Sequence, residues 1–174
     1  FGKALADRIE WRKPRMVEEC YYMLWDDMKQ GPCISVVDSW DALVAIVDRD
    51  KFLEKKKAFE NGKGTSGSYG TAPPKLHSAN LREVVNNCEE SGSIVIGISQ
   101  SRTNIGFGSQ FKPETRSGGV ALTFYATGEL WFKIRGEFRR RVKGKDETIG
   151  HRLLVKVEKN RESGWEPDVE LHHY

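Results

Sequence analysis

The stretch CISVVDSWDAL, residues 33–43, decides the fold. Its first half, Cys33–Val37, is short, β-branched and almost wholly apolar, which is typical of a central strand in a parallel sheet covered on both faces. A second run of the same kind, Ser93–Ser99, leads to Gln100. Because ligands of open α/β sheets bind beyond the carboxyl ends of the strands, we expect Asp38 and Gln100 to share one crevice there.

Helical patterns flank both runs. Pro14 is expected in the first turn of a helix, where its missing N–H costs nothing, and apolar residues follow it at helical spacing: Val17, Cys20, Tyr21, Leu24 and Met28. Residues 48–75 are charged and then rich in Gly, Ser and Pro, which predicts a polar helix followed by a loop. Leu81, Val84 and Cys88 mark another amphipathic helix. The alternation of helices and strands predicts α/β layers with right-handed crossovers.

The character of the sequence changes after residue 119. Val120–Tyr125 is predicted as a strand, and apolar residues then alternate with polar ones as far as Leu171. Turns are expected at Thr127-Gly128, Gly136, Gly144–Asp146 and Ser163-Gly164. The predicted fold class is therefore α/β: a mainly parallel sheet flanked by helices and extended by antiparallel hairpins on the C-terminal side. We expect one domain over residues 1–174.

Composition narrows the class of protein. The chain has 174 residues, 38% hydrophobic and 30% charged, with a formal net charge of +3 that identifies no partner by itself. Its three cysteines fall on apolar periodic positions without C-x-x-C spacing, which indicates reduced thiols rather than disulfides or zinc ligands. No apolar run reaches the ~18 residues of a membrane span, and no signal peptide is visible. A cytoplasmic location without membrane contact is expected.

Two residues at the strand ends suit phosphate chemistry. An apolar strand ending in aspartate, as at Asp38, is the Walker B pattern, whose carboxylate holds Mg²⁺, often through water. The same residue could simply be a turn or cap residue. Gln100 could contact a phosphate or orient a water, or it could be an ordinary polar strand end. The segment Gly62–Gly67 fits G-x-G-x-x-G, but no strand precedes it and no helix opens at its third glycine, so it is not a dinucleotide site.

About twenty residues separate Gln100 from Val120, far more than the ~4–6 of a typical connection. This loop carries cations and phenylalanines among glycines: Arg102, Phe107, Phe111, Lys112 and Arg116. Such a mixture suits single-stranded nucleic acid, since bases stack while phosphates are neutralised; packing of the phenylalanines against the domain is the alternative. Residues 133–145 hold seven more cations. They predict either a solvated hairpin face or a polyanion contact.

Four blocks, in this order, resemble the RecA/UvsX-type recombinase family. CISVVDSWDAL at 33–43 is similar to its Walker B strand, and IVIGISQSR at 94–102 to the strand whose Gln senses the nucleotide. PETRSGGVALTFYA at 113–126 resembles the end of the second DNA-binding loop, and VKVEKNR at 155–161 a V-K-V-x-K-N-[KR] strand. The resemblance covers about residues 14–172.

The resemblance implies ATP and Mg²⁺ as cofactors. Asp38 would be the Walker B carboxylate, with Mg²⁺ held through water, and Ser39 would lie beside the nucleotide. Gln100 would be the catalytic residue that links the γ-phosphate to the following loop. Lys159 and Arg161 match basic positions that reach the nucleotide of a neighbouring protomer, and Phe124 would lie near that interface.

The same resemblance assigns nucleic-acid contacts. Residues of about 62–75 would form the first DNA-binding loop and 101–119 the second, with these contact residues: Arg102, Thr103, Asn104, Phe107, Lys112, Arg116, Gly118 and Gly119. The implied function is a DNA-dependent ATPase that forms filaments on single-stranded DNA and pairs it with homologous duplex DNA for strand exchange in recombination and repair. The alternatives are a non-hydrolysing single-stranded-DNA-binding paralogue or fragment, and a hexameric helicase-type ATPase on the same fold.

The chain also departs from the family pattern. The family's phosphate loop and catalytic glutamate precede the Walker B strand, yet the residues before Cys33 hold neither element, and Glu10 lies too close to the first helix to replace the glutamate. We therefore expect an N-terminally incomplete ATPase core that by itself does not hydrolyse ATP well. Arg116-Ser117 stands where threonines are common, and Trp40-Asp41 where small apolar residues are usual.

Overall fold

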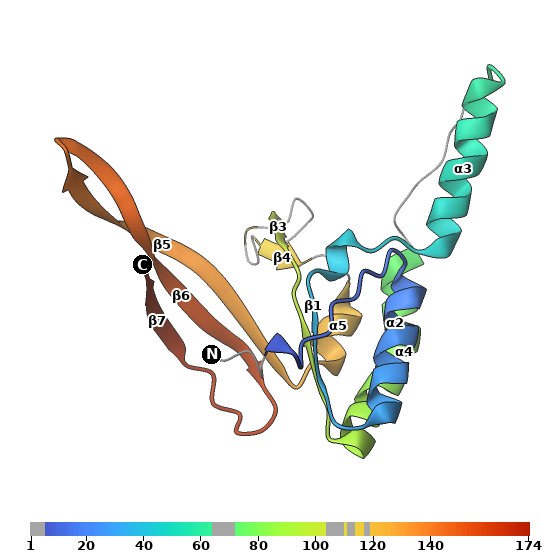
Figure 1. The fold of residues 1–174 in the computed structure, drawn as a ribbon, viewed down its shortest axis with the longest axis horizontal. Helices are drawn as coiled ribbons and strands as arrows, with labels where there is room; N and C mark the ends of the chain where they lie inside the picture. The colour runs from blue at the N-terminus through green and yellow to red at the C-terminus, as the bar shows by residue number, and fades with distance from the viewer. Residues whose placement is uncertain (1–5, 64–71, 104–109, 111–113, 117–118) are drawn as a thin grey trace. The chain divides into compact units, whose positions relative to one another are not determined.

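The computed structural model describes residues 6–63, 72–103, 110, 114–116 and 119–174 (Figure 1). The chain divides into two compact units, residues 1–125 and 126–174. The first unit contains these elements: α2 (Val17–Gln30), β1 (Ile34–Val37), the 3₁₀ turn η1 (Trp40–Ala42), α3 (Ile46–Glu60), α4 (Ala72–Ser91), β2 (Ile94–Gly97), β3 (Ser101–Thr103), β4 (Glu114–Arg116) and α5 (Val120–Tyr125). The second unit is a sheet of three strands: β5 (Gly128–Val142), β6 (Lys145–Asn160) and β7 (Asp168–His173).

The first unit is built on the two predicted strands. β1 and β2 pair in parallel, from Ile34 opposite Ile94 to Val37 opposite Gly97. Helices α2 and α4 supply most of the core on one side of this pair (Figure 1), with these buried residues: Val17, Cys20, Tyr21, Leu24, Met28, Val37, Trp40, Leu43, Leu81, Val84, Ala121 and Leu122. The mixed α/β character is thus confirmed, whereas parallel pairing among the described strands is limited to β1 and β2.

The prediction that both faces of β1 are covered was wrong for the residues that the structure describes. Ile34 and Val36 are 68% and 60% exposed, and their partners Ile94 and Ile96 are exposed as well. The alternation along the strand explains the pattern, because successive side chains point to opposite faces and only the face that carries Val37 meets the helices.

The first helix begins later than predicted. Pro14 lies outside α2, which starts at Val17. Met16 forms an isolated parallel bridge with Val44, and the Val17 N–H donates to the Val44 carbonyl at 3.1 Å, so the preceding chain is held extended. The helix ends at Gln30 and is followed by Gly31, whose φ of 138° few other residues adopt.

The region between the two strands is more helical than predicted. The expected polar helix is α3, on which Phe52 and Phe59 are exposed. α4 already begins at Ala72, so residues 72–75 are helical and were wrongly assigned to a loop. Prolines 73 and 74 fit this position, since the first turn of a helix has no partner for their missing N–H groups. The remainder of the expected loop, residues 64–71, lies outside the described residues.

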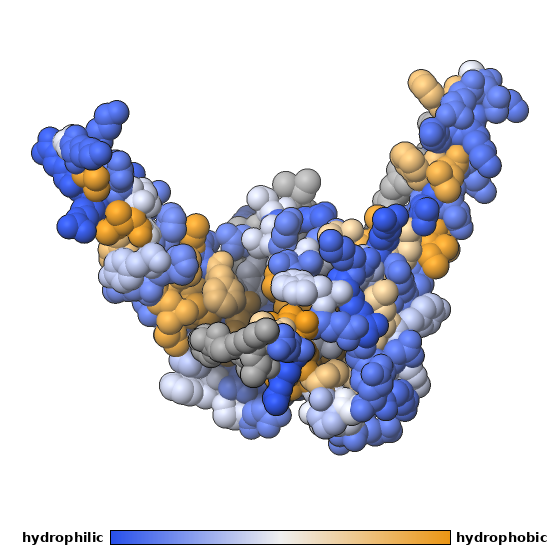
Figure 2. Space-filling view, viewed as in Figure 1, coloured by the Kyte–Doolittle hydropathy of each residue, from blue (hydrophilic) through white to orange (hydrophobic). Residues whose placement is uncertain are grey.

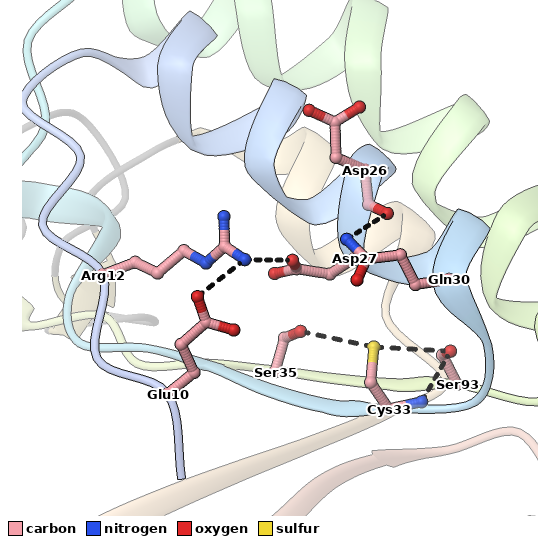
Figure 3. A network of polar contacts seen from close by, with 8 residues as sticks. All are labelled: Glu10, Arg12, Asp26, Asp27, Gln30, Cys33, Ser35 and Ser93. Atoms are coloured by element: carbon pink, nitrogen blue, oxygen red, sulfur yellow. Dashed lines mark hydrogen bonds and ion pairs between the residues drawn. The ribbon is translucent and has the colours of Figure 1, made fainter. Parts of the chain in front are cut away.

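Side chains near the start of β1 tie the strand pair together (Figure 3). The Cys33 N–H donates to Ser93 Oγ at 3.1 Å, and Ser91 Oγ donates to Ser93 Oγ at 2.7 Å. The predicted free thiols are confirmed for Cys20, Cys33 and Cys88. Burial, helped by nearby Glu19, raises the pKa of the Cys20 thiol to about 11, which keeps it protonated and unreactive.

The prediction of a strand at Val120–Tyr125 was wrong, because these residues form α5. Ala121 and Leu122 are consecutive and both buried, whereas a strand would have turned one of them outward. α5 packs against α4. A six-residue apolar run suits either element, so periodicity alone could not separate them.

The antiparallel hairpins of the second unit are confirmed. β5 pairs with β6 and β6 with β7. Lys143 and Gly144, with φ of 50° and 80°, form the two-residue turn between β5 and β6, as that type of hairpin requires. The turn predicted at Gly136 was wrong, since β5 continues through it with a register shift between Ile134 and Gly136. The glycine serves a β-bulge there.

Burial in the second unit is sparse. Val155, 8% exposed, is the buried apolar side chain among the described residues of this unit, whereas Leu130, Phe132 and Ile134 on β5 are more than half exposed. Figure 2 shows hydrophilic side chains over the β5–β6 turn and hydrophobic ones farther down these strands. The sheet therefore depends on cross-strand contacts rather than on an enclosed core.

Candidate functional site

The carboxyl ends of β1 and β2 form one edge of the sheet. The Ile98 N–H donates to the Val37 carbonyl at 2.9 Å, and the Trp40 N–H donates to the Ile98 carbonyl at 3.1 Å, so pairing continues past both strands. Asp38 directly follows β1 and Gln100 lies two residues beyond Ile98; both are exposed, and Ser39 is half-buried. The structure thus brings Asp38, Ser39 and Gln100 to the same edge. The peptide bond between Asp38 and Ser39 is cis.

Two residues that the sequence reasoning left without a role also hold this edge. Trp40, 5% exposed, stacks on Tyr21 of α2 with ring centroids 5.4 Å apart and meets His77 of α4 edge-on at 5.3 Å. Next to it, the Asp41 Oδ2 accepts a hydrogen bond from the Gln100 N–H at 2.6 Å. The signal available in the sequence was a large aromatic residue and a charge placed directly behind an apolar strand.

A buried polar pair lies beneath this edge. The Tyr21 hydroxyl and His77 Nδ1 are 2.8 Å apart, and His77 is only 1% exposed. Burial lowers the pKa of His77, with nearby Asp41 opposing the change, and burial raises the pKa of Tyr21. At neutral pH the pair is therefore an uncharged imidazole bonded to a neutral phenol, which makes it a structural support for Trp40 rather than an acid–base group.

The long loop begins and ends in a short antiparallel ladder, so it is not structureless throughout as expected. Ser101 pairs with Arg116, Arg102 with Thr115 and Thr103 with Glu114. Of the predicted contact residues, Arg102, Thr103 and Arg116 lie in this ladder. Gly119 is described as well, whereas Asn104, Phe107, Lys112 and Gly118 lie outside the described residues.

Gly119 joins the loop to α5 in a conformation that favours glycine. Its φ is +77°, and a Cβ built on it would stand 3.1 Å from Cβ of Pro74 in α4. Both the backbone angle and the close neighbour disfavour a side chain at this position. Gly119 therefore lies against the start of α4.

The two predicted basic nucleotide contacts belong to the second unit. Lys159 lies near the end of β6, opposite Glu129 of β5. Arg161 follows β6 directly, and its N–H donates to the Thr127 carbonyl at 2.9 Å. Asp38 belongs to the first unit, so a role of Lys159 and Arg161 at a nucleotide stays a prediction.

The cationic stretch 133–145 has acidic neighbours. Arg140 pairs with Glu147 across the hairpin and Arg141 with Asp146, while the Arg139 guanidinium contacts the Glu137 carboxylate at 2.9 Å. Directly opposed side chains lie close enough for opposite charges to interact. This arrangement favours the solvated hairpin face over a dedicated polyanion contact.

The residues at the edge fit a cation that is held indirectly. Among the residues that the structure describes, no three His, Cys, Asp or Glu side chains gather as a metal site. Mg²⁺ needs no such cage, because it usually keeps several waters and is bound by one or two carboxylates together with substrate phosphates. The exposed Asp38 carboxylate suits that arrangement. In the same part of the chain, none of the helices is long and apolar enough to span a membrane.

Comparison with known proteins assigns the chain that forms this edge to a family. The sequence model of the RecA N-terminal domain matches residues 33–171, from the start of β1 into β7. The chain belongs to the RecA family. It is 37% identical to the protein RecA of Chelativorans sp. (strain BNC1) over 131 residues, which are 74% of this chain and 34% of that protein.

Other RecA proteins match to the same extent. That of Haemophilus ducreyi is 36% identical over 131 residues, 74% of this chain and 33% of the relative, and that of Leptospira biflexa is 37% identical over 133 residues, 74% and 32%. The chain spans about a third of the length of these curated RecA relatives. The match includes Asp38, Gln100 and the ladder of β3 and β4, so the RecA family resemblance covers the whole described edge.

Proposed function

We propose that this chain is the part of a RecA-family recombinase that connects a nucleotide-binding edge to a single-stranded-DNA-binding loop. The observation that carries the proposal is the direct continuity of the edge. Asp38 directly follows β1, Gln100 lies three residues after the end of β2, and the next residue, Ser101, begins the ladder that closes the loop. A change at the edge would therefore reach the loop without an intervening element.

The edge residues divide the work by their chemistry. Asp38 would hold Mg²⁺ through water, and Ser39 would offer its hydroxyl to the nucleotide. The Mg²⁺ and ATP would supply the charge and phosphates to which this edge responds. Gln100 would orient toward the γ-phosphate as the catalytic sensor, since its amide can donate and accept hydrogen bonds. Because Gln100 also starts the loop, nucleotide state and loop order would be one two-state equilibrium.

The loop would bind the DNA strand. Arg102 and Arg116 stand on neighbouring strands of the ladder and would neutralise phosphates, and Thr103 and Gly119 would lie along the same path. Asn104, Phe107, Lys112 and Gly118 complete the proposed contacts, with the phenylalanine available for base stacking. Affinity without sequence preference and with strong salt dependence is the expected behaviour.

The proposal extends to the assembly of the longer protein. Lys159 and Arg161 would reach the nucleotide of a neighbouring protomer, and Phe124, 65% exposed on α5, would contact that protomer. Repetition of this contact would give a helical filament that pairs its strand with homologous duplex DNA in recombination and repair. The proposed location is the cytoplasm of a bacterial or phage-infected cell.

Deletion of residues 103–117, with Arg102 joined directly to Gly118, tests the DNA site. We expect anisotropy of a labelled oligothymidylate to show a loss of affinity of at least about tenfold, since stacking and phosphate contacts are removed together. Circular dichroism should show an unchanged helix content. The matched control is the double variant Arg139→Ala, Arg140→Ala, which removes two cations from the hairpin and should lose much less. Unchanged binding after the deletion would contradict the proposal.

Electron microscopy of the longer protein with single-stranded DNA and a slowly hydrolysed ATP analogue tests the assembly. Helical filaments are expected. Closed hexameric rings would support a helicase-type ATPase instead, and DNA binding without any response to the analogue would support a non-hydrolysing binding protein.

A further inference from the structure

Trp40 is fixed in place on three sides. Its indole stacks on Tyr21 of α2 and meets His77 of α4, and it lies so close to Gly97 of β2 that a Cβ on that residue would collide with the indole ring. The His77 ring is in turn bonded to the Tyr21 hydroxyl. A side chain that packs against two helices and a strand has few alternative rotamers. Because Trp40 is the first residue of η1, this packing also restricts the backbone at the start of η1.

Asp41, the residue after Trp40, forms a hydrogen bond with the chain beyond the end of β2. Its Oδ2 accepts the Gln100 N–H at 2.6 Å, across 59 residues of sequence. The Trp40 N–H donates to the Ile98 carbonyl one step earlier, so two hydrogen bonds in succession join η1 to the chain leaving β2. A charged acceptor forms a shorter and stronger bond than a neutral one.

The hydrogen bond between Asp41 and the Gln100 N–H lies at the residue from which the loop leaves the sheet. Gln100 is the last residue before β3, whose three residues pair with β4. Without a partner for its N–H, Gln100 would be free to rotate, and the ladder of Arg102 and Thr115 would lose its anchor to the sheet. Asp41 itself is half-buried and follows Trp40, so its position is determined by the packing beneath it.

We propose that Asp41 is a positioning residue: it holds the Gln100 backbone so that the nucleotide-facing side chain and the base of the DNA loop keep one fixed orientation. The inference rests on the proposed function for its biological meaning. Its structural content does not, because the hydrogen bond and the ladder are present in the chain alone. Asp41 is assigned no contact with nucleotide or DNA.

Three variants separate positioning from charge. Asp41→Ala removes both the acceptor and the charge, Asp41→Asn removes only the charge because its amide oxygen still accepts, and Asp50→Ala removes an exposed charge of α3 as the matched control. Amide hydrogen exchange of Gln100 and Ser101–Thr103 is measured by NMR, and affinity for labelled oligothymidylate by anisotropy. Circular dichroism verifies folding of each variant.

Positioning predicts that Asp41→Ala accelerates exchange at Gln100 by at least about tenfold. The same variant should weaken DNA binding by about fivefold, whereas Asp41→Asn should retain most of both properties and Asp50→Ala all of them. A purely electrostatic role predicts the opposite for DNA: both Asp41 variants would bind tighter, since a negative charge is removed beside a polyanion site. That result, or exchange unchanged in Asp41→Ala, overturns the inference.

The two proposals fail in different ways. If the unsubstituted chain binds no DNA, the proposed function fails, while the exchange rates still decide whether Asp41 holds Gln100. If the unsubstituted chain binds DNA and Asp41→Ala binds it equally well, the proposed function stands and the inference is wrong.

Discussion

The two units of the chain are stabilised by different kinds of contact. In the first unit, α2 and α4 enclose a core in which Tyr21, Trp40 and His77 lie in mutual contact. In the second unit, β5 carries Phe132 and Ile134 at more than 60% exposure. The first unit is therefore specified by packing against helices, and the second by strand register and turn geometry.

This difference in packing decides which unit can hold a functional side chain in a fixed position. A proposed nucleotide sensor needs a rigid support, and in the first unit the buried Trp40, two residues after Asp38, supplies one. The second unit has the basic side chains Lys159 and Arg161 at the end of β6, a strand with few buried residues. Substitutions should therefore have large effects on stability in the first unit and small ones in the second.

The largest effect is expected for Trp40→Ala. Removing a buried indole leaves a cavity among Tyr21, His77 and Gly97, and truncation of buried aromatic residues costs about 3–5 kcal/mol. Urea unfolding followed by circular dichroism measures the change. Trp165→Ala, at a residue that is 72% exposed in the second unit, is the matched control and should change stability by less than about 0.5 kcal/mol. Equal losses in the two variants would erase the contrast between the units.

A smaller loss is expected for Gly97→Ala. The added Cβ would collide with the Trp40 indole, which is too well packed to move freely, and overpacking of this kind costs about 1–3 kcal/mol. Gly128→Ala in β5 is the control, because a Cβ there would stand 3.8 Å from the Lys159 carbonyl, an ordinary contact. Thermal unfolding of both variants gives the comparison. A neutral Gly97→Ala would show that Trp40 is not fixed against β2.

Much of the first unit could be predicted from its sequence because its elements are locally consistent. The run Cys33–Val37 and the helical spacing of Leu81, Val84 and Cys88 needed no tertiary information. Val120–Tyr125 failed because a short apolar run is equally compatible with both elements, and only contact with α4 decides it. Gly136 failed since a glycine in an alternating pattern marks a bulge as well as a turn.

The candidate site was only partly accessible to the same reasoning. Asp38 and Gln100 could be placed at one edge since parallel strands align their carboxyl ends. The hydrogen bond between Asp41 and the Gln100 N–H could not be predicted, because the two residues lie 59 positions apart and sequence spacing does not show that they meet. Nor does sequence spacing show that Tyr21 and His77, 56 residues apart, form a buried pair.

The pH dependence of stability should reveal His77. Burial holds its folded pKa below the ordinary 6.5, so as the pH falls through 6.5 the unfolded chain takes up a proton before the folded chain does. Its contribution to stability is thus complete above pH 6.5 and is lost toward the folded pKa, with a slope of at most about 1.4 kcal/mol per pH unit. Urea unfolding at several pH values from neutral to mildly acidic should give a shallower dependence for His77→Gln. Parallel curves for the two proteins would contradict this assignment.

The smallest effect belongs to the hairpin of the second unit. Hydrogen bonds from Arg139 and then Thr148 lower the pKa of the exposed Glu137 carboxyl below its ordinary 4.5. A carbon-detected NMR titration should therefore place the Glu137 midpoint below that value, and Arg139→Ala should move it back upward. Arg140→Ala is the control, since Arg140 faces Glu147 instead and should leave the midpoint unchanged. Because surface ion pairs contribute little to stability, Arg139→Ala should leave the unfolding midpoint nearly unchanged, in contrast to Trp40→Ala. A large loss of stability would show that the second unit depends on its charges more than its strand register implies.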